Sequence, residues 1–537
     1  MKQVNKKRVL LVGGLLALAG GSLFSGISAA ATGEEIIQKR CLDCHSETGD
    51  ADMPYSRISE QRKTPEGWQM TIQRMVSIQE AKLRPDERKT VLKYLADTQG
   101  LAPSESAPLR YALERDENVM EDNDPAYAEM CARCHSGARF GLQRRTQDEW
   151  KWLIHFHMGQ IPTLELHSLA RDRPWFELAL NETAPKLAEA YPYDTKAWRD
   201  WQAAPKPTFG HDWSVSGYIP GKGEFAALMR ASAKGGDRYA LTLSGHYADG
   251  TPLSGEGSAI TYTGYEWRAS LDIDGVAMRQ VLAADESGRR MNGRMFLDAA
   301  NNVGGSFLAQ RAAAGDQAVS ALIPSYIRQG ERQEITLVGA GLKGMPDLGE
   351  GVRVVKVISS GSNRMRVLAE AAPGAAVGQR DVSVGAARGE ARLAVYDKVA
   401  RVEVTPSESV ARIGGNGMPI PKMKAVYRAV GYAAGADGEA GTGDDLRLGY
   451  MPATWQLQPF DEVAKEENDL KYAGSIDADG IFTPGDAGLN PERKMSTNNV
   501  GNLSVVATVR NGDGADSGQA HLPVPVPRFG RAPVPEA

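Results

Sequence analysis

Apolar and polar residues follow two different spacings along the chain, and the change comes near residue 208. Before it, apolar residues recur at helical spacing, as in the amphipathic run 84–95 that ends near Gly100. The same spacing predicts helices at 33–43, 124–133 and 174–190, and two more that begin after Thr64 and Thr146. The first part of the chain is therefore predicted to be α-helical.

From about residue 210 the apolar residues alternate in short runs separated by glycine turns, which is typical of antiparallel strands. These runs are predicted at 212–218, 224–231, 239–246, 259–271, 278–284 and 290–298. Their close spacing favours an antiparallel β-barrel at 209–316. Two immunoglobulin-like β-sandwiches are predicted after it, at 317–398 and 399–537. The predicted fold class is multidomain, with an α-helical domain at 32–208 followed by all-β domains.

Composition agrees with this division and excludes several classes of protein. The chain has 537 residues, of which 42% are hydrophobic and 24% charged, so a disordered chain or a polytopic membrane protein is not expected. Its 58 glycines follow no three-residue period and fit turns between short strands. The formal net charge of −5 comes with no basic patch that would indicate nucleic-acid binding.

Residues 1–31 have the pattern of a cleaved secretory signal. Basic residues at Lys2, Lys6, Lys7 and Arg8 precede an apolar run, and small residues close it at 28–31. An uncleaved membrane anchor is the alternative, which the glycines of the apolar run disfavour. We expect a periplasmic protein with no membrane contact after cleavage, because no other segment is long and apolar enough to span a bilayer.

All four cysteines lie in two C-x-x-C-H strings, Cys41-Leu42-Asp43-Cys44-His45 and Cys131-Ala132-Arg133-Cys134-His135. In c-type haem attachment the two thiols of such a string bond the vinyl groups of one porphyrin, and the adjacent histidine becomes the proximal iron ligand. One zinc site or two disulfides could also use four cysteines, but neither would explain the repeated histidine. The strings therefore predict two covalent haem c groups.

An internal repeat follows the two strings. Arg62-Lys63-Thr64-Pro65-Glu66-Gly67-Trp68 comes after the first and Arg144-Arg145-Thr146-Gln147-Asp148-Glu149-Trp150 after the second. Each threonine suits a helix N-cap, and Glu149 is predicted to complete a capping box with Thr146.

The repeat also predicts the distal iron ligands. Seven residues beyond each tryptophan lie Met75 and His157, whose side chains are both known as distal haem ligands. Met70 and Met53 are the rivals of Met75, and His155 is the rival of His157. The prediction is a His/Met first haem and a bis-His second haem, so that residues 32–208 form two fused cytochrome c units.

These strings, the repeat and the β-rich remainder together resemble the alpha subunit of quinohemoprotein amine dehydrogenase, over essentially the whole mature chain. The resemblance implies a heterotrimer with a β-propeller subunit and a small subunit that carries a cysteine tryptophylquinone. It implies that the quinone oxidises primary amines to aldehyde and ammonia. It also implies that the two haems pass the electrons to a soluble cytochrome c or a blue copper protein. Since no cysteine is left over for a quinone crosslink, we expect this chain not to oxidise the amine itself.

Two other functions stay open at this stage. A diheme cytochrome c peroxidase would use one His/Met haem and one open haem, but would not need so long a β region. A non-catalytic periplasmic electron-transfer protein would use its β domains to bind a partner.

Overall fold

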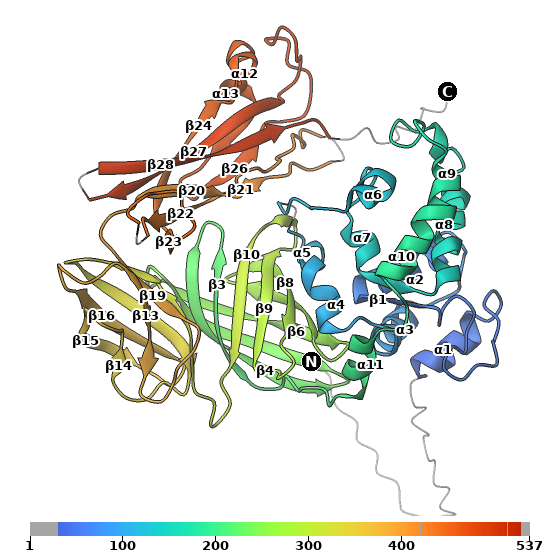
Figure 1. The fold of residues 1–537 in the computed structure, drawn as a ribbon, viewed down its shortest axis with the longest axis horizontal. Helices are drawn as coiled ribbons and strands as arrows, with labels where there is room; N and C mark the ends of the chain where they lie inside the picture. Colours follow the sequence, from blue (N-terminus) through green and yellow to red (C-terminus); the bar gives the residue numbers. More distant parts are fainter. Residues whose placement is uncertain (1–30, 117, 418–419, 436, 513, 528–537) are drawn as a thin grey trace, which may run out of the picture.

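A computed structural model describes residues 31–527, apart from 117, 418–419, 436 and 513. The predicted signal segment therefore lies outside the described residues, except for its last residue. The helical region, the barrel and two further β regions follow one another along the chain, and the barrel lies between the helices and the 317–398 region (Figure 1). Within the described residues, no helix has the length and apolar character needed to cross a membrane.

The first helical unit is built from α1 (Gly33–Arg40), α2 (Pro65–Ser77) and α3 (Pro85–Thr98). Each helix begins at a favourable cap: Thr32 forms a capping box with Glu35, and the other two helices have proline at their first position. Their apolar faces pack around Trp68, which is 1% exposed. The three predicted helices of this unit are confirmed, although α1 ends at Arg40 rather than at residue 43.

The second unit repeats this arrangement with more irregular helices. Its main helices are α6 (Pro125–Tyr127), η2 (Ala128–Ala132), α8 (Gln147–Gln160), α9 (Trp175–Leu178), η4 (Ala179–Thr183) and α10 (Ala184–Ala190). The predicted helices at 124–133 and 174–190 each contain a π-helical stretch, η2 and η4. In the second case Pro185 follows the stretch, and a proline has no N–H for the carbonyl four residues earlier, so the helix widens there.

Short helices lie between the two units, within the second unit and before the barrel. They are α4 (Pro103–Ser106), η1 (Ala107–Leu109), α5 (Arg110–Leu113), α7 (Ala138–Gly141), η3 (Leu164–Leu166) and α11 (Lys196–Ala203). The two units are joined by an antiparallel ribbon of β1 (Gln61–Lys63) and β2 (Gln143–Arg145). These strands occupy equivalent places in the repeat, immediately before the threonine caps, so the ribbon relates the units by a pseudo-twofold axis.

Eight antiparallel strands close the barrel. They are β3 (Asp212–Ile219), β4 (Gly223–Gly235), β5 (Arg238–Tyr247), β6 (Pro252–Tyr262), β7 (Glu266–Ile273), β8 (Val276–Ala284), β9 (Arg290–Leu297) and β10 (Ala300–Arg311). The barrel is confirmed, but the single strand predicted at 259–271 is wrong. Thr263 and Gly264 both have positive φ and turn the chain there, which separates β6 from β7.

The last helix of the helical region closes one end of the barrel. Trp198 and Trp201 of α11 belong to the barrel core, and the indole N–H of Trp201 donates to the carbonyl of Thr263 at 2.8 Å. Arg268 on β7 reaches back to Glu66 at the start of α2, with 2.6 Å between Nε and the carboxylate. The first helical unit is thus fixed directly on the barrel.

The region 317–398 contains two main sheets that share one core. Its strands are β11 (Ala318–Ile323), β12 (Tyr326–Arg328), β13 (Arg332–Ala340), β14 (Pro346–Asp347), β15 (Val352–Ser360), β16 (Arg364–Ala371), β17 (Gly378–Asp381), β18 (Ser383–Val384) and β19 (Arg392–Tyr396). One sheet has the order β11-β13-β16-β15 and the other the order β12-β19-β17.

The last region contains three three-stranded sheets around one core. Its elements are β20 (Arg401–Thr405), β21 (Ala425–Val426), β22 (Arg428–Ala433), β23 (Leu446–Tyr450), β24 (Ala453–Pro459), α12 (Glu462–Glu466), α13 (Asp469–Tyr472), β25 (Gly474–Ile476), β26 (Ile481–Pro484), β27 (Gly501–Asn511) and β28 (Gly514–Val524). The two short helices are absent from the sequence prediction. Asp461 caps the first of them by accepting from the N–H of Ala464 at 2.8 Å.

Candidate functional site

The first C-x-x-C-H string begins where α1 ends. The N–H of Cys41 closes the last turn of the helix, and the N–H groups of Cys44 and His45 both donate back to the Cys41 carbonyl. This tight turn holds the two thiols and the imidazole beside the core of the first unit, against which Cys41 packs. Burial, followed by the neighbouring Cys44, raises the pKa of the Cys41 thiol to about 11, so the thiol is neutral at physiological pH.

His45 is oriented by one hydrogen bond. Its Nδ1 lies 2.9 Å from the carbonyl oxygen of Ser56, an oxygen that can only accept, so Nδ1 carries the proton. The opposite nitrogen, Nε2, then has its lone pair available for a metal. This is the usual arrangement of a metal-binding histidine.

The second string lies at the end of η2 and has the same features. Burial, followed by the neighbouring Cys134, raises the pKa of the Cys131 thiol to about 11. His135 Nδ1 lies 3.0 Å from the carbonyl oxygen of Ser136, which again leaves Nε2 free to bind a metal. Both predicted proximal histidines therefore have Nδ1 hydrogen-bonded to a backbone carbonyl, although the acceptor is eleven residues away for His45 and the next residue for His135.

Glu121 holds the loop that follows the second string. Its carboxylate accepts from the N–H of Gly137 at 2.6 Å and from the hydroxyls of Tyr111 and Ser136. Burial opposes its ionisation, but these hydrogen bonds prevail and lower the pKa of Glu121 to about 2. Sequence reasoning missed this residue, because nothing in the sequence marks its contact with the loop.

The two ligand helices, α2 and α8, are held in the same way. Trp68 and Trp150 are both buried. Each indole N–H donates to the carbonyl of the residue that directly follows the closing helix of its unit. The acceptors are Gln99 after α3, at 2.9 Å, and Tyr191 after α10, at 3.3 Å. The predicted repeat is thus present in three dimensions.

One detail of the predicted repeat is wrong. Thr146 accepts from the N–H of Glu149 as expected, but the Glu149 side chain does not complete the capping box. Its carboxylate binds Arg145 and Arg57 instead, both at 2.6 Å, and the N–H of Thr146 donates to the carbonyl of Glu60. Two guanidinium groups attract a buried carboxylate more strongly than one backbone N–H does.

His157 and His155 point in different directions on α8. His157 Nδ1 donates to the carbonyl of Leu153 at 2.7 Å, which leaves Nε2 free, and its ring centroid lies 5.8 Å from that of Trp175. Burial, together with the nearby charges of His135 and Arg139, lowers the pKa of His157. The structure therefore brings His157 near His135. His155 is exposed instead.

The methionines of the first unit are spread over its surface and interior. Met75 is half-buried on α2, two turns beyond Trp68, and Met53 is half-buried in the loop after the first string. Met70 is 43% exposed, and its sulfur accepts from Arg139 of the second unit at 3.4 Å. Met70 therefore contacts the second unit.

The alternative uses of the four cysteines receive no support. All four are free thiols. Within the described residues, no three side chains among the histidines, cysteines, aspartates and glutamates come together as a metal-binding group. The two strings lie in separate units, so the four thiols do not form one zinc site.

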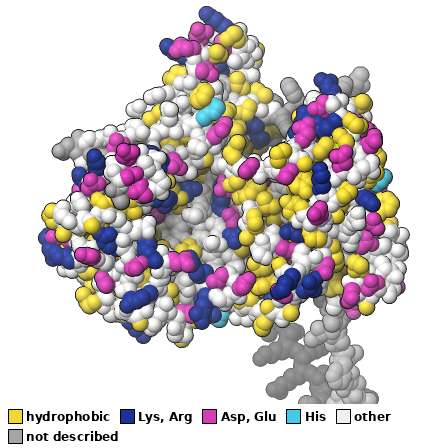
Figure 2. All heavy atoms as spheres, viewed as in Figure 1, with side chains coloured by type: hydrophobic (Ala, Val, Ile, Leu, Met, Phe, Trp, Pro, Cys, Tyr) yellow, Lys and Arg dark blue, Asp and Glu magenta, His cyan; other side chains and the backbone are white. Residues whose placement is uncertain are grey.

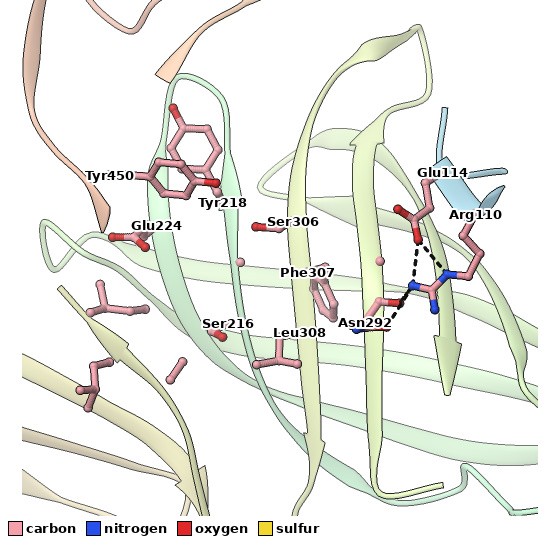
Figure 3. Close-up of a pocket in the computed structure, with 15 residues that line it drawn as sticks. Arg110, Glu114, Ser216, Tyr218, Glu224, Asn292, Ser306, Phe307, Leu308 and Tyr450 are labelled. Carbon is pink, nitrogen blue, oxygen red and sulfur yellow. Dashed lines mark hydrogen bonds and ion pairs between the residues drawn. The ribbon is translucent and has the colours of Figure 1, made fainter. Parts of the chain in front are cut away.

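A polar cleft of about 480 Å³ lies away from both strings, where the barrel meets its neighbours (Figure 3). Figure 2 shows the molecule hollowed at this place between the barrel and the 317–398 region. Tyr218 and Glu224 of the barrel, with Tyr450 of the last region, line one side, and Arg110 and Asn292 lie on the other. Burial raises the pKa of Glu224 to about 7, even though nearby arginines oppose the shift.

Several solved structures are distantly similar to parts of this chain. A redesigned β-barrel, mFAP1, bound to DFHBI, is 16% identical, with 19% of this chain and 93% of the barrel covered and a TM-score of 0.17. A gamma-CGTase from alkalophilic Bacillus clarkii is 10% identical over 56% of this chain and 41% of the enzyme, with a TM-score of 0.13. The SGBP-B protein of a Bacteroides ovatus mixed-linkage glucan utilization locus is 10% identical over 60% and 67%, with a TM-score of 0.16. A search of curated proteins finds no match.

Four protein-family models match successive parts of the chain. The haem-binding model of the quinohemoprotein amine dehydrogenase alpha subunit matches residues 31–198. The models of domains II, III and IV of the same subunit match 207–312, 316–397 and 402–534. Together they extend over nearly all of the described residues, and the first contains both cysteine strings. The chain therefore belongs to the family of quinohemoprotein amine dehydrogenase alpha subunits, and its helical region is the haem-binding domain of that family.

Proposed function

We propose that this chain is the diheme electron-transfer subunit of a periplasmic amine dehydrogenase complex. The observation that carries the proposal is the duplicated site: two C-x-x-C-H strings, each with its histidine Nδ1 bound to a carbonyl and Nε2 free. A single haem would need only one such arrangement. The family assignment supplies the reaction, oxidative deamination of a primary amine.

In this proposal Cys41 and Cys44 hold the first haem c, with His45 as proximal and Met75 as distal ligand. The half-buried position of Met75 on α2 supports its assignment over the exposed Met70.

Cys131 and Cys134 hold the second haem c, with His135 as proximal and His157 as distal ligand. Both histidines present an unprotonated Nε2. The charge of His135 acts on His157, and this supports a site that both histidines face. Haem bound at each position would supply reversible one-electron chemistry at iron. The hydrogen bonds of both Nδ1 atoms keep these rings in the tautomer that binds metal.

The remaining parts of the proposal concern the assembly. A partner subunit carries the cysteine tryptophylquinone, because this chain has no cysteine beyond the two strings. A β-propeller subunit completes the heterotrimer. The electrons leave to a soluble cytochrome c or a blue copper protein. Residues 1–31 direct export of the chain. The domain boundaries are 32–208, 209–316, 317–398 and 399–537. The last two domains are immunoglobulin-like.

Haem content tests the proposal. The chain is produced with its partners in a periplasm that attaches haem c, and the alkaline pyridine spectrum gives the number of haems per chain. We expect two haems in the wild type and one in each of the double variants Cys41→Ser/Cys44→Ser and Cys131→Ser/Cys134→Ser. The variant His167→Ala, outside both strings, is the control and should retain two. A wild-type chain with zinc, with disulfides or with fewer than two haems contradicts the proposal.

A further inference from the structure

Five cationic side chains gather where the two helical units meet. Lys63 and Arg74 come from the first unit, Arg139 and Arg145 from the second, and Arg57 from the loop before the ribbon. Their charges act on one another: Arg145 and Arg74 disfavour the charged form of Lys63, and Arg139 disfavours that of Arg74. Such a cluster is costly unless anions lie within it.

The protein itself supplies one carboxylate to this cluster. Glu149 binds Arg145 and Arg57, as described above. At the equivalent place in the first unit the chain has Gly67, three residues after the threonine cap, so Lys63 has no matching carboxylate. The first unit is therefore short of one negative charge at this junction.

Three of the cations contact only neutral groups in the described part of the chain. Lys63, which is 4% exposed, donates to the Thr71 hydroxyl at 2.8 Å. The guanidinium of Arg74 lies 5.1 Å from the ring centroid of Phe156. The guanidinium of Arg139 donates to the Met70 sulfur. Lys63 is buried, Arg74 is half-buried and Arg139 is exposed, and a cationic cluster whose members have neutral partners can accept an anion.

Two of these cations lie beside the ligands of the second site. Arg139 is on α7, four residues after His135, and its charge acts on both His135 and His157. Phe156, which Arg74 covers, is next to His157 in the chain. The guanidinium of Arg74, on α2 of the first unit, therefore contacts α8, the helix of the second unit that carries His157.

We propose that Arg74 and Arg139 bind the propionate carboxylates of the second haem, so that the first unit completes the second haem pocket. This inference rests on the proposed function, because it requires haem at the second site. A carboxylate accepts two parallel N–H bonds from a guanidinium, and two such groups match the two propionates of one haem.

The proposed pairing has a consequence for the electron. Reduction of ferric haem adds a negative charge, which nearby guanidinium groups favour. Neutral side chains at 74 or 139 are therefore expected to make the second haem harder to reduce. Arg74 belongs to the first unit. An effect of its substitution on the second haem therefore distinguishes this inference from a role of Arg74 within its own unit only.

The experiment is a spectroelectrochemical titration of the purified holoenzyme complex, with haem content measured on the same samples. The ferric thioether band identifies the first haem. At a fixed ambient potential we expect Arg74→Gln and Arg139→Gln each to lower the reduced-to-oxidised ratio of the second haem by about tenfold. Arg74→Lys, which keeps the charge, should retain most of the wild-type ratio. Arg199→Gln removes an exposed ion pair with Asp194 in the same domain and should change neither haem.

Every outcome bears on the inference. An unchanged ratio in Arg74→Gln or Arg139→Gln chains that hold two haems overturns it, and so does an equal change in Arg199→Gln. Loss of the second haem in Arg74→Gln with retention in Arg74→Lys supports it, since the charge is then what the site needs. If neither Arg74 variant retains the second haem, the reduced-to-oxidised ratio of the second haem in Arg139→Gln decides: a lowered ratio supports the inference and an unchanged ratio overturns it. A wild type without a second haem refutes the proposed function instead.

Discussion

Arg62 and Arg144 lie opposite each other in the β1–β2 ribbon, and both guanidinium groups bind the one carboxylate of Glu105. The distances are 2.9 Å from Arg62 and 3.1 Å from Arg144, and all three side chains are at most 9% exposed. Because the two arginines hold equivalent places in the repeat, the carboxylate lies close to the pseudo-twofold axis. The carboxylate thus binds an arginine from each of the two helical units.

Glu105→Gln should destabilise the helical region. Burial opposes ionisation, but the hydrogen bonds and charge of Arg62 prevail and lower the pKa of Glu105, so the carboxylate is charged in the folded protein. Its loss leaves two buried guanidinium groups without their anion, at a cost of about 3–5 kcal/mol. Urea unfolding followed by haem absorbance measures this.

The matched control is Asp86→Asn, which removes an exposed ion pair with Arg84 in the same domain. We expect a change below about 0.5 kcal/mol there. Equal effects of the two variants would show that Glu105 is an ordinary surface carboxylate.

Glu121→Gln should remove part of the pH dependence of stability. The pKa of Glu121 is about 2 in the folded protein and has its ordinary value of 4.5 in the unfolded one, so folding is favoured when the residue is ionised. Its contribution is present above pH 4.5 and is lost as the pH falls towards 2. After discounting for solvent screening, we expect the variant to lose about 1–2 kcal/mol at pH 7 and little at pH 2. Thermal unfolding across this pH range measures it, and an equal loss at both ends would contradict the assignment.

His157→Ala should open the second haem. A bis-imidazole haem is low-spin, and loss of the distal ligand leaves a vacant or water-bound position. The expected result is a high-spin ferric component in the absorption and electron paramagnetic resonance spectra of one haem in two. His155→Ala, two residues earlier and exposed, is the control and should leave both spectra unchanged. The reverse pattern would make His155 the ligand.

Met75→Ala should abolish the ferric thioether-to-iron absorption band, because its sulfur is the proposed distal ligand of the first haem. Met70→Ala and Met53→Ala should preserve the band. The experiment is an absorption spectrum of each oxidised variant. A band that survives in Met75→Ala and disappears in one of the others would move the ligand to that residue.

The sequence predicted the repeat because its signals are local. A threonine cap, a tryptophan four residues later and an apolar stripe act within one helix, and the contacts of Trp68 and Trp150 confirm their equivalence. The barrel strands with clear alternation were found for the same reason. Local patterns of this kind depend on few residues outside the element.

The misses have physical reasons as well. In β6, Gly255 and Gly257 interrupt the apolar alternation, and in β10, Gly304 and Gly305 do so. A Cβ at Gly257 would lie 2.1 Å from the carbonyl of Ser270 on the next strand, so glycine there reflects close strand approach rather than a turn. Such a contact is set by a distant strand.

The ion pairs that join the units could not be predicted from the sequence. Glu105 lies 43 positions from Arg62 and 39 from Arg144, and Glu149 exchanges a predicted cap for two arginines. Both outcomes depend on how the two units meet. The sequence does contain a pair of basic residues before each threonine, Arg62-Lys63 and Arg144-Arg145, but the contacts of these residues follow only from the pairing of β1 with β2.

We propose that this chain accepts electrons from an amine oxidised in a partner subunit and holds them on two haems. Anaerobic addition of a primary amine to the purified oxidised complex, followed by the haem absorption bands, tests it most directly. We predict that both haems of each chain become reduced, and that the complex with Cys131→Ser/Cys134→Ser reduces only the first. Haems that stay oxidised with every primary amine, in a complex that contains its partner subunits, would contradict the claim.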